Sequence, residues 1–258
     1  MSGKKPVLVF CPGAWCAPEY FKFTTDILTK AGYTCLTVSL PSVGSELRPK
    51  DAPPITHGLQ TDANAVRDVV IPQLDAGHNV VLVCHSYGGV VTSEAVKGLD
   101  AASRGPNTGA VIHLVYVAAI VLDVGGKVWP DGDPPKSEFI IEGELCWRNP
   151  EAPGTALWLA GCNEEQMMLV VSSVRTHVRK CFNDITTYDG WRHIPSTYAR
   201  ATKDLMPNMI AEAPEGHRFE DIVEVDGDHF AFCSAPEEVA AVIQKASEKA
   251  VKALDTIV

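Results

Sequence analysis

The sequence has no hydrophobic run of the length, about 18 residues, that a membrane-spanning helix needs. It also has few basic residues, because 22 Lys and Arg stand against 32 Asp and Glu, for a formal net charge of −10. An acidic surface repels phosphate backbones, so we expect neither a nucleic acid nor a membrane as a partner. The remaining composition, 46% hydrophobic and 21% charged, is typical of a globular protein and excludes a mainly disordered or fibrous chain.

Motifs that hold metals or phosphates are missing as well. The eight cysteines are scattered and form no paired C-x-x-C motifs, and neither an H-E-x-x-H motif nor a glycine-rich phosphate loop occurs. We therefore expect no metal and no cofactor. The first residues, Met-Ser-Gly-Lys-Lys-Pro, lack the apolar core and cleavage site of a signal peptide. This predicts a cytoplasmic protein whose cysteines are reduced and mostly buried.

What the sequence does contain is an alternation of strand and helix patterns. The continuous apolar run at residues 79–84 is typical of a strand buried on both faces of a parallel sheet. Other strands are predicted at 7–10, 33–40, 111–118, 196–201 and 219–225, and helices at 18–31, 62–74, 88–96 and 237–254. Such alternation predicts an α/β fold with parallel pairing through right-handed crossovers.

The alternation is interrupted between residues 120 and 193, where prolines and four of the five tryptophans gather. Within this stretch the spacing of apolar residues predicts one helix over 164–180. About 75 residues bury little core alone, so this stretch is predicted to be an insertion rather than an independent domain. We expect a core formed by residues 1–119 and 194–258, with a cap, or lid, at 120–193.

A candidate nucleophile lies where the buried strand turns into the next helix. Residues 84–89 read Cys-His-Ser-Tyr-Gly-Gly, close to the G-x-S-x-G pattern of a nucleophile elbow, with Cys84 in place of the first glycine. Small residues are needed on both sides of the serine because the turn is tight. The pattern identifies Ser86 as the nucleophile, and we expect a packing role for His85.

A serine nucleophile needs a base, and the base needs an acid that orients it. His229 follows the strand at 219–225 and should lie at the same edge of the sheet as Ser86. In the chain order serine, acid, histidine, the acid falls between them. Asp204, directly after the strand at 196–201, is the preferred candidate, and Asp123 is the alternative.

Acyl transfer also needs N–H donors for the negative oxygen of the transition state. Tyr87, the residue after the nucleophile, should supply one backbone N–H from the start of its helix. The loop after the first strand, Cys-Pro-Gly-Ala-Trp-Cys at 11–16, should supply the other from Ala14, because Gly13 allows close approach.

These residues resemble the α/β-hydrolase superfamily over nearly the whole chain. More narrowly, the chain resembles the branch of plant methylesterases, the salicylate-binding esterase and hydroxynitrile lyases. Four segments carry the resemblance: Pro12-Gly13-Ala14-Trp15, the elbow at 84–89, Thr202-Lys203-Asp204 and Gly227-Asp228-His229. The first, with Leu-Pro-Ser-Val-Gly at 40–44, is most similar to fungal and bacterial hydrolases, some of secondary metabolism.

The resemblance implies an α/β-hydrolase fold, with a mostly parallel central sheet flanked by helices and a helical cap inserted after strand 6. It implies a serine hydrolase that cleaves a carboxylic ester, lactone or thioester of a small hydrophobic metabolite. Hydroxynitrile lyases of this branch have a hydroxyl residue where Gly13 stands and a lysine where Phe230 stands, so cyanohydrin cleavage is disfavoured. A C–C bond hydrolase, another lyase or a cyclase on the same triad remains an alternative, and a ligand-binding receptor is a third.

The cap should cover Ser86 with an apolar pocket and so select the substrate. Six residues are expected to line it: Trp15, Trp147, Trp158, Met167, Met168 and Trp191. The resemblance also makes a homodimer possible, because some relatives pair through their caps.

Overall fold

The computed structural model describes residues 4–44, 47, 56–105, 108–130, 132–133, 136–152, 156–159, 161–206 and 219–255. A parallel six-stranded sheet in the order β2-β1-β3-β4-β8-β9 forms the centre. Its strands are β1 (Val7–Cys11), β2 (Cys35–Thr37), β3 (Val80–His85), β4 (Val111–Val117), β8 (Ser196–Ala201) and β9 (Phe219–Val225). The α/β-hydrolase fold class predicted from the sequence is therefore confirmed.

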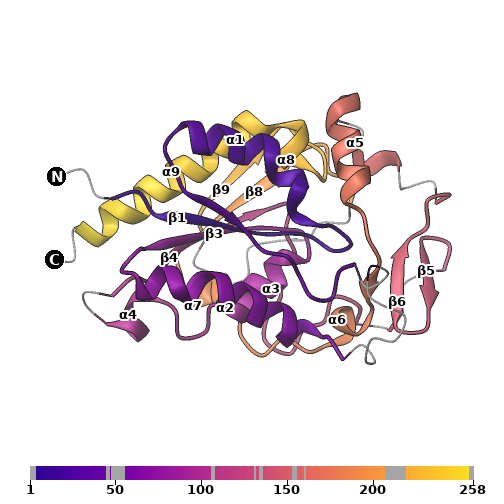
Figure 1. Cartoon of the computed structure of the whole chain (residues 1–258), viewed down its shortest axis with the longest axis horizontal. Coiled ribbons are helices and arrows are strands. Elements are labelled where there is room, and N and C mark those ends of the chain that lie inside the picture. The colour runs from indigo at the N-terminus through magenta and orange to yellow at the C-terminus, as the bar shows by residue number, and fades with distance from the viewer. Residues whose placement is uncertain are drawn as a thin grey trace.

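Helices cover both faces of this sheet (Figure 1). On one face lie the 3-10 helix η1 (Pro18–Phe21) and helices α1 (Lys22–Lys30), α8 (Ala231–Ser234) and α9 (Pro236–Asp255). On the other face lie α2 (Leu59–Asp75), α3 (Gly88–Ala95) and α7 (Gly190–His193). The short helix α4 (Ala101–Arg104) lies near one end of α2. None of the helices in the described parts of the chain is both long and apolar enough to span a bilayer.

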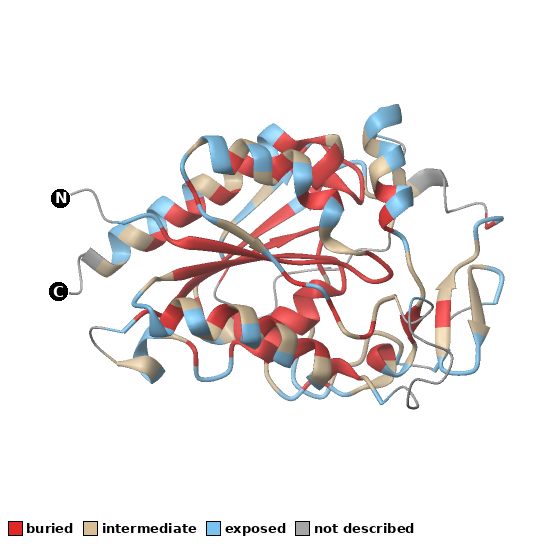
Figure 2. Cartoon of the chain, viewed as in Figure 1, coloured by how far each residue is buried: buried red, intermediate tan, exposed pale blue. Residues whose placement is uncertain are grey.

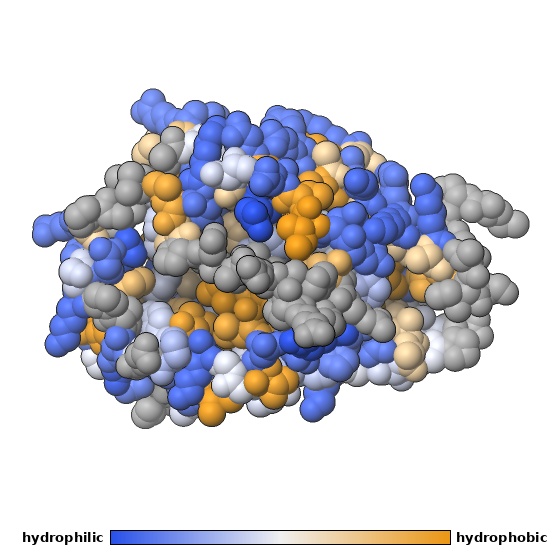
Figure 3. Space-filling model, turned by 180° about the vertical axis from the view of Figure 1, so that it is seen from behind, coloured by the Kyte–Doolittle hydropathy of each residue, from blue (hydrophilic) through white to orange (hydrophobic). Residues whose placement is uncertain are grey.

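The sheet is buried on both sides, as continuous apolar strands require. In β1 successive side chains point to opposite faces: Val7 and Val9 pack toward α2 and α3, while Leu8 and Phe10 pack toward α1 and α9. Figure 2 shows the resulting buried layer through the middle of the molecule. Much of the face seen in Figure 3 is hydrophilic, and hydrophobic residues gather in separate patches, one of them near the middle of this face.

The cap lies at the carboxyl ends of the strands, at the opposite end of the molecule from the termini (Figure 1). It contains an antiparallel sheet of β5 (Phe139–Glu142), β6 (Leu145–Arg148) and β7 (His177–Val178), besides η3 (Ala156–Leu159), α5 (Glu164–Ser173) and α6 (Lys180–Asn183). The expectation of a helical cap needs correction in its content, because the antiparallel sheet makes this cap mixed. The cap leaves the central sheet after β4 and returns to it at β8, between the two strands where the insertion was expected.

The single helix predicted over 164–180 is wrong in its second half. Helix α5 ends at Ser173, and Val174 has extended backbone angles. From there the chain forms backbone hydrogen bonds with two loops of the core, at residues 15–17 and 42–44, before α6 begins. Val174, Thr176 and Val178 are β-branched and suit an extended segment, and its distant partners outweigh the helical spacing.

Candidate active site

The turn between β3 and α3 holds Ser86 in a strained conformation, with a φ angle of +50°. The two glycines that follow make the turn possible. A Cβ atom on Gly88 would lie 2.5 Å from the carbonyl oxygen of Pro12, and one on Gly89 would lie 2.4 Å from that of Ile120. The carbonyl oxygen of Ser86 accepts hydrogen bonds from the N–H groups of Gly89 and Ile120. Ser86 is thereby fixed above the carboxyl edge of the sheet.

Two further side chains follow neighbouring strands and meet Ser86 at this edge. His229, four residues after β9, places its Nε2 atom 3.2 Å from Ser86 Oγ. Asp204, three residues after β8, places its Oδ2 atom 2.9 Å from His229 Nδ1. The other carboxylate oxygen of Asp204 accepts the Met206 N–H at 2.9 Å. These are the contacts that a serine nucleophile, its base and an orienting acid require.

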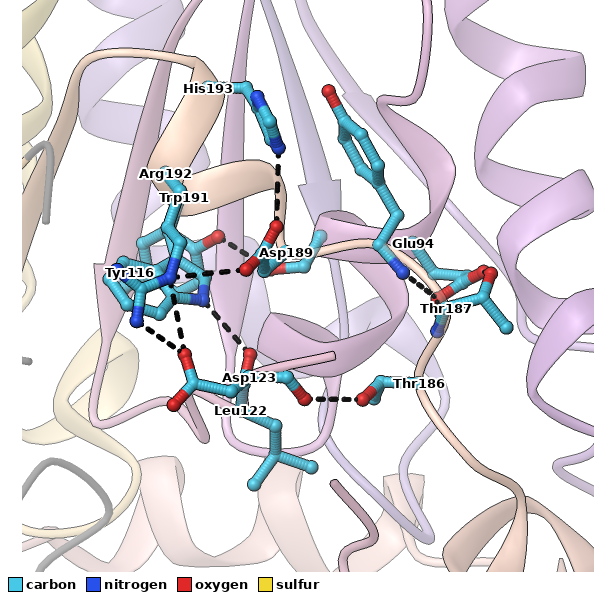
Figure 4. Close-up of polar contacts among 12 residues, drawn as sticks. Glu94, Tyr116, Leu122, Asp123, Thr186, Thr187, Asp189, Trp191, Arg192 and His193 are labelled. Atoms are coloured by element: carbon cyan, nitrogen blue, oxygen red, sulfur yellow. Dashed lines mark hydrogen bonds and ion pairs between the residues drawn. The ribbon is translucent and has the colours of Figure 1, made fainter. Parts of the chain in front are cut away.

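Asp123, the alternative acid, has other partners. It follows β4, but its carboxylate forms an ion pair with Arg192 at 2.7 Å and is more than half exposed. Figure 4 shows this pair beside Trp191, whose indole N–H donates to the carbonyl oxygen of Leu122. The geometry therefore favours Asp204 over Asp123.

Two backbone N–H groups near Ser86 have no hydrogen-bond partner among the residues that the structure describes. They belong to Ala14 and Tyr87. Both neighbours of Ala14 are engaged, since the Gly13 N–H donates to Tyr20 Oη and the Trp15 N–H donates to His177 Nδ1. Unpaired N–H groups on both sides of a nucleophile could bind an oxyanion.

A cavity of about 80 Å³ opens onto Ser86, His229 and these two residues. Its walls are mainly aromatic and come from the core and the cap: Trp15, Trp129, Phe139, Trp158, Phe182 and Phe230. No Asp, Glu, Lys or Arg side chain is among the described residues that line it. The cavity therefore suits an uncharged, apolar group.

Comparison with known proteins shows the family. The model of the alpha/beta hydrolase family matches residues 8–242. The chain belongs to this family. It is 29% identical to the α/β hydrolase nvfD of Aspergillus novofumigatus over 96% of this chain and 99% of that protein. It is 26% identical to a probable hydrolase, R7, of a Phoma species, over 93% of this chain and 97% of that one.

A solved structure shows the same fold at much lower identity. Polyneuridine aldehyde esterase superposes with a TM-score of 0.70 at 16% identity, over 95% of this chain and 100% of the esterase. Membership of the family makes the chain a hydrolase, which agrees with the class of enzyme predicted from the sequence.

Of the six residues expected to line the pocket of this hydrolase, Trp15 and Trp158 do so. The indole of Trp158 lies 5.4 Å from the His229 ring, measured between ring centroids. Four aromatic wall residues were missed: Trp129, Phe139, Phe182 and Phe230. The sequence signal for them was only the abundance of aromatic residues in and near the cap, which does not tell a wall residue from a packing residue.

The other four residues lie elsewhere, and those expectations need correction. Trp191 is fully buried in the core of the hydrolase and stacks on Phe219 at 5.8 Å. Met167 and Met168 lie on the exposed side of α5, because α5 packs on the core through Val170. Trp147 is half-buried on β6, packs against the core, and is not part of the cavity wall.

His85 does more in this hydrolase than the predicted packing. Its Nδ1 atom accepts from Tyr20 Oη at 2.9 Å, and its Nε2–H donates to the carbonyl oxygen of His229 at 2.7 Å. Burial, together with the nearby His229, lowers the pKa of His85 well below its usual range, so the ring is neutral. His85 thereby connects the Gly13 loop, through Tyr20, to the backbone of His229.

A second buried polar cluster lies next to the loop that contains Trp15, where atoms of Asp62, His177 and Cys181 come within 4.8 Å of one another. Such a set could hold a metal ion, but the oxygen and nitrogen atoms already have partners. Asp62 accepts from the Ser42 N–H, the Ser42 hydroxyl and the Tyr87 hydroxyl. His177 contacts the Trp15 N–H and Ser42 Oγ. The cluster therefore has the organisation of a hydrogen-bond network rather than of a metal site.

Proposed function

We propose that this hydrolase cleaves a carboxylic ester, lactone or thioester of a small hydrophobic metabolite through Ser86, His229 and Asp204. The observation that carries the proposal is the pair of contacts made by the His229 ring. Its Nε2 atom lies 3.2 Å from Ser86 Oγ, and its Nδ1 atom lies 2.9 Å from Asp204 Oδ2. Both contacts lie at the edge of an aromatic cavity.

In the proposed mechanism, His229 takes the Ser86 proton as Ser86 Oγ attacks the carbonyl carbon. Asp204 accepts a hydrogen bond from Nδ1–H, which keeps the other ring nitrogen free as the base and stabilises the imidazolium. The N–H groups of Ala14 and Tyr87 bind the oxyanion. The protonated His229 then gives its proton to the leaving group. Water, activated by the same ring, releases the acid from the acyl-enzyme.

The cavity wall supports a small apolar substrate. Its described side chains include six aromatic residues and no formal charge, so a charged acyl or alcohol group would lose its hydration without gaining a partner. Phe230, directly after the base, adds to this apolar surface. The fold shared with polyneuridine aldehyde esterase also supports ester cleavage.

The test is hydrolysis of p-nitrophenyl butyrate by the purified chain and by Ser86→Ala. We expect kcat to fall by roughly 10⁴-fold or more when the nucleophile is removed. Ser172→Ala is the matched control and should keep full activity, because this serine is exposed and its hydroxyl donates to the Leu169 carbonyl of the same helix.

A fluorophosphonate probe separates the triad from the reaction type. Labelling of Ser86 with turnover of simple esters supports the whole proposal. Labelling without turnover of any ester, lactone or thioester would keep the triad but overturn ester hydrolysis in favour of C–C cleavage or cyclisation. Full turnover by Ser86→Ala would overturn the nucleophile itself.

A further inference from the structure

We propose that His177, a residue of the cap, is a positioning residue for the oxyanion hole, because it holds the loop that presents the Ala14 N–H. This rests on the proposed function, since the hole matters only if an oxyanion forms at Ser86. His177 is not part of the cavity wall and contacts no reacting atom. Its effect would pass through the backbone of Trp15.

The cap is joined to the oxyanion loop by backbone hydrogen bonds. The Ala17 N–H donates to the carbonyl oxygen of Ser173 at 2.9 Å, and the Arg175 N–H donates to that of Trp15 at 2.7 Å. Cys16 and Val174 form an antiparallel bridge between them. The oxyanion loop therefore has a strand-like partner that comes from the cap and lies more than 150 residues away in the chain.

The same cap segment also pairs with a second loop of the core. The Gly44 N–H donates to the carbonyl oxygen of Thr176, and the Val178 N–H donates to that of Ser42, both at 2.9 Å. Residues 173–178, which we call the strap, thus tie the loop after β1 to the loop after β2. His177 lies near the middle of these contacts and is completely buried.

Trp15 is the residue that needs this support. Its φ angle is +61°, in the left-handed region that a tryptophan rarely adopts. Such a conformation is strained and persists only where the surroundings fix it. The strap supplies both restraints, because His177 Nδ1 accepts the Trp15 N–H at 3.1 Å and the Arg175 N–H donates to the Trp15 carbonyl. If Trp15 relaxed, the adjoining Ala14 N–H would move.

The imidazole of His177 is suited to act as an acceptor. Burial lowers its pKa to about 3, so the ring is neutral at physiological pH. Because Nδ1 accepts from Trp15, the proton resides on Nε2, which donates to Ser42 Oγ at 2.8 Å. The Ser42 hydroxyl in turn donates to Asp62 at 2.6 Å. The network fixes both the tautomer and the orientation of the ring.

This network reaches both N–H donors of the oxyanion hole. Asp62 Oδ2 also accepts from the Tyr87 hydroxyl at 3.0 Å, and Tyr87 carries the second donor. On the other side of the loop, Tyr20 Oη accepts the Gly13 N–H at 2.9 Å. The N–H groups of residues 13 and 15 are therefore fixed by side chains, and the one between them is left for the substrate.

Three variants at position 177 separate this role from simple packing. In His177→Asn, the Oδ1 atom can replace Nδ1 and accept the Trp15 N–H. His177→Gln can keep the hydrogen bond with Ser42 but not the one with Trp15, and His177→Leu loses both bonds. We expect kcat on p-nitrophenyl butyrate, per active site titrated with a fluorophosphonate, to fall about 100-fold in the Leu and Gln variants. The Asn variant should stay within about fivefold of the unmodified chain, and KM should change little in all three.

Inhibitor binding gives a readout that a merely structural role would not move. A trifluoromethyl ketone forms an oxyanion at Ser86, whereas the matching methyl ketone mostly stays a neutral ligand. The Leu and Gln variants should lose affinity for the first in proportion to kcat/KM and bind the second normally. Equal loss of both, or equal impairment of the Asn and Leu variants, would overturn the role of His177. If His177→Leu does not fold, the Asn and Gln variants carry the same comparison.

Ser86→Ala, assayed in parallel, separates this proposal from the proposed function. If Ser86→Ala retains full turnover, the proposed function is wrong. An inactive Ser86→Ala together with unchanged kcat and trifluoromethyl ketone affinity in His177→Gln means that only the positioning role is wrong.

Discussion

Replacing Gly88 with alanine should damage catalysis more than stability. The added Cβ would lie 2.5 Å from the carbonyl oxygen of Pro12 and 2.6 Å from that of Cys11, where real contacts stay beyond 3.0 Å. Both neighbours are backbone atoms, so no side-chain rotation can relieve the contact. To bring the 2.5 Å contact up to the 3.0 Å limit, the elbow and the loop that carries Ala14 must separate by at least about 0.5 Å.

The size of the effect follows from that separation. A displacement of about 1 Å in an active site can cost about 100-fold in rate, so half of it should lower kcat by roughly 10- to 100-fold. Overpacking of this kind destabilises a protein by about 1–3 kcal/mol. We would measure kcat per titrated active site and the free energy of unfolding in urea.

Gly77→Ala is the control for strain alone. Its φ angle is +78°, and a Cβ there would meet nothing within 4 Å. It should therefore cost about 1 kcal/mol of stability through its backbone conformation and leave kcat unchanged. A Gly88→Ala variant with undiminished kcat would refute the link between this close approach and the oxyanion hole.

Three further predictions concern the acid, the cavity wall and pH. Asp204→Asn should lower kcat by about 10⁴-fold in the same ester assay, whereas Asp123→Asn, which loses only an exposed ion pair, should stay within about twofold; the reverse order would mean the wrong acid. Trp158→Ala should raise KM for the butyrate ester roughly tenfold, the equivalent of about 1.4 kcal/mol of lost apolar contact, and an unchanged KM would remove it from the substrate site. Burial lowers the pKa of His113 from 6.5 to about 4. Between these pH values the unfolded chain binds more protons than the folded chain, so the free energy of unfolding falls as the pH drops from 6.5 to 4. His113 alone should account for about 2 kcal/mol of this loss at about pH 5, and urea unfolding of His113→Gln should show a correspondingly smaller loss; an equal pH dependence would contradict it.

The contacts among Ser86, Asp204 and His229 could be predicted from the sequence because the positions of these residues follow from the order of the strands. Each of the three follows a strand of the central sheet by one to four residues, and the carboxyl ends of parallel strands meet at one edge. Their mutual contacts therefore need only the correct strand order. The alternation of strand and helix patterns predicts that order, and the elbow glycines mark the turn that carries Ser86.

The cap was predicted less well, because its residues are chosen by partners far away in the chain. Trp191 is apolar in the way that a pocket residue is, but it packs on Phe219 in the core. The apolar residues over 164–180 have helical spacing, but the helix ends at Ser173. The strap that follows is extended because backbone groups of the loops at 15–17 and 42–44 pair with it. No local pattern indicates His177, since its side-chain partners, Trp15 and Ser42, come from two segments far away in the chain.

The most direct test of the central claim is mass spectrometry of the acyl-enzyme. The chain would be mixed with p-nitrophenyl butyrate, quenched in acid within milliseconds and digested. The account predicts a butyryl group on the peptide that contains Ser86, absent from Ser86→Ala and still present in the Ser172→Ala control. A butyryl group on another residue that accounts for turnover, or turnover that persists undiminished in Ser86→Ala, would contradict it.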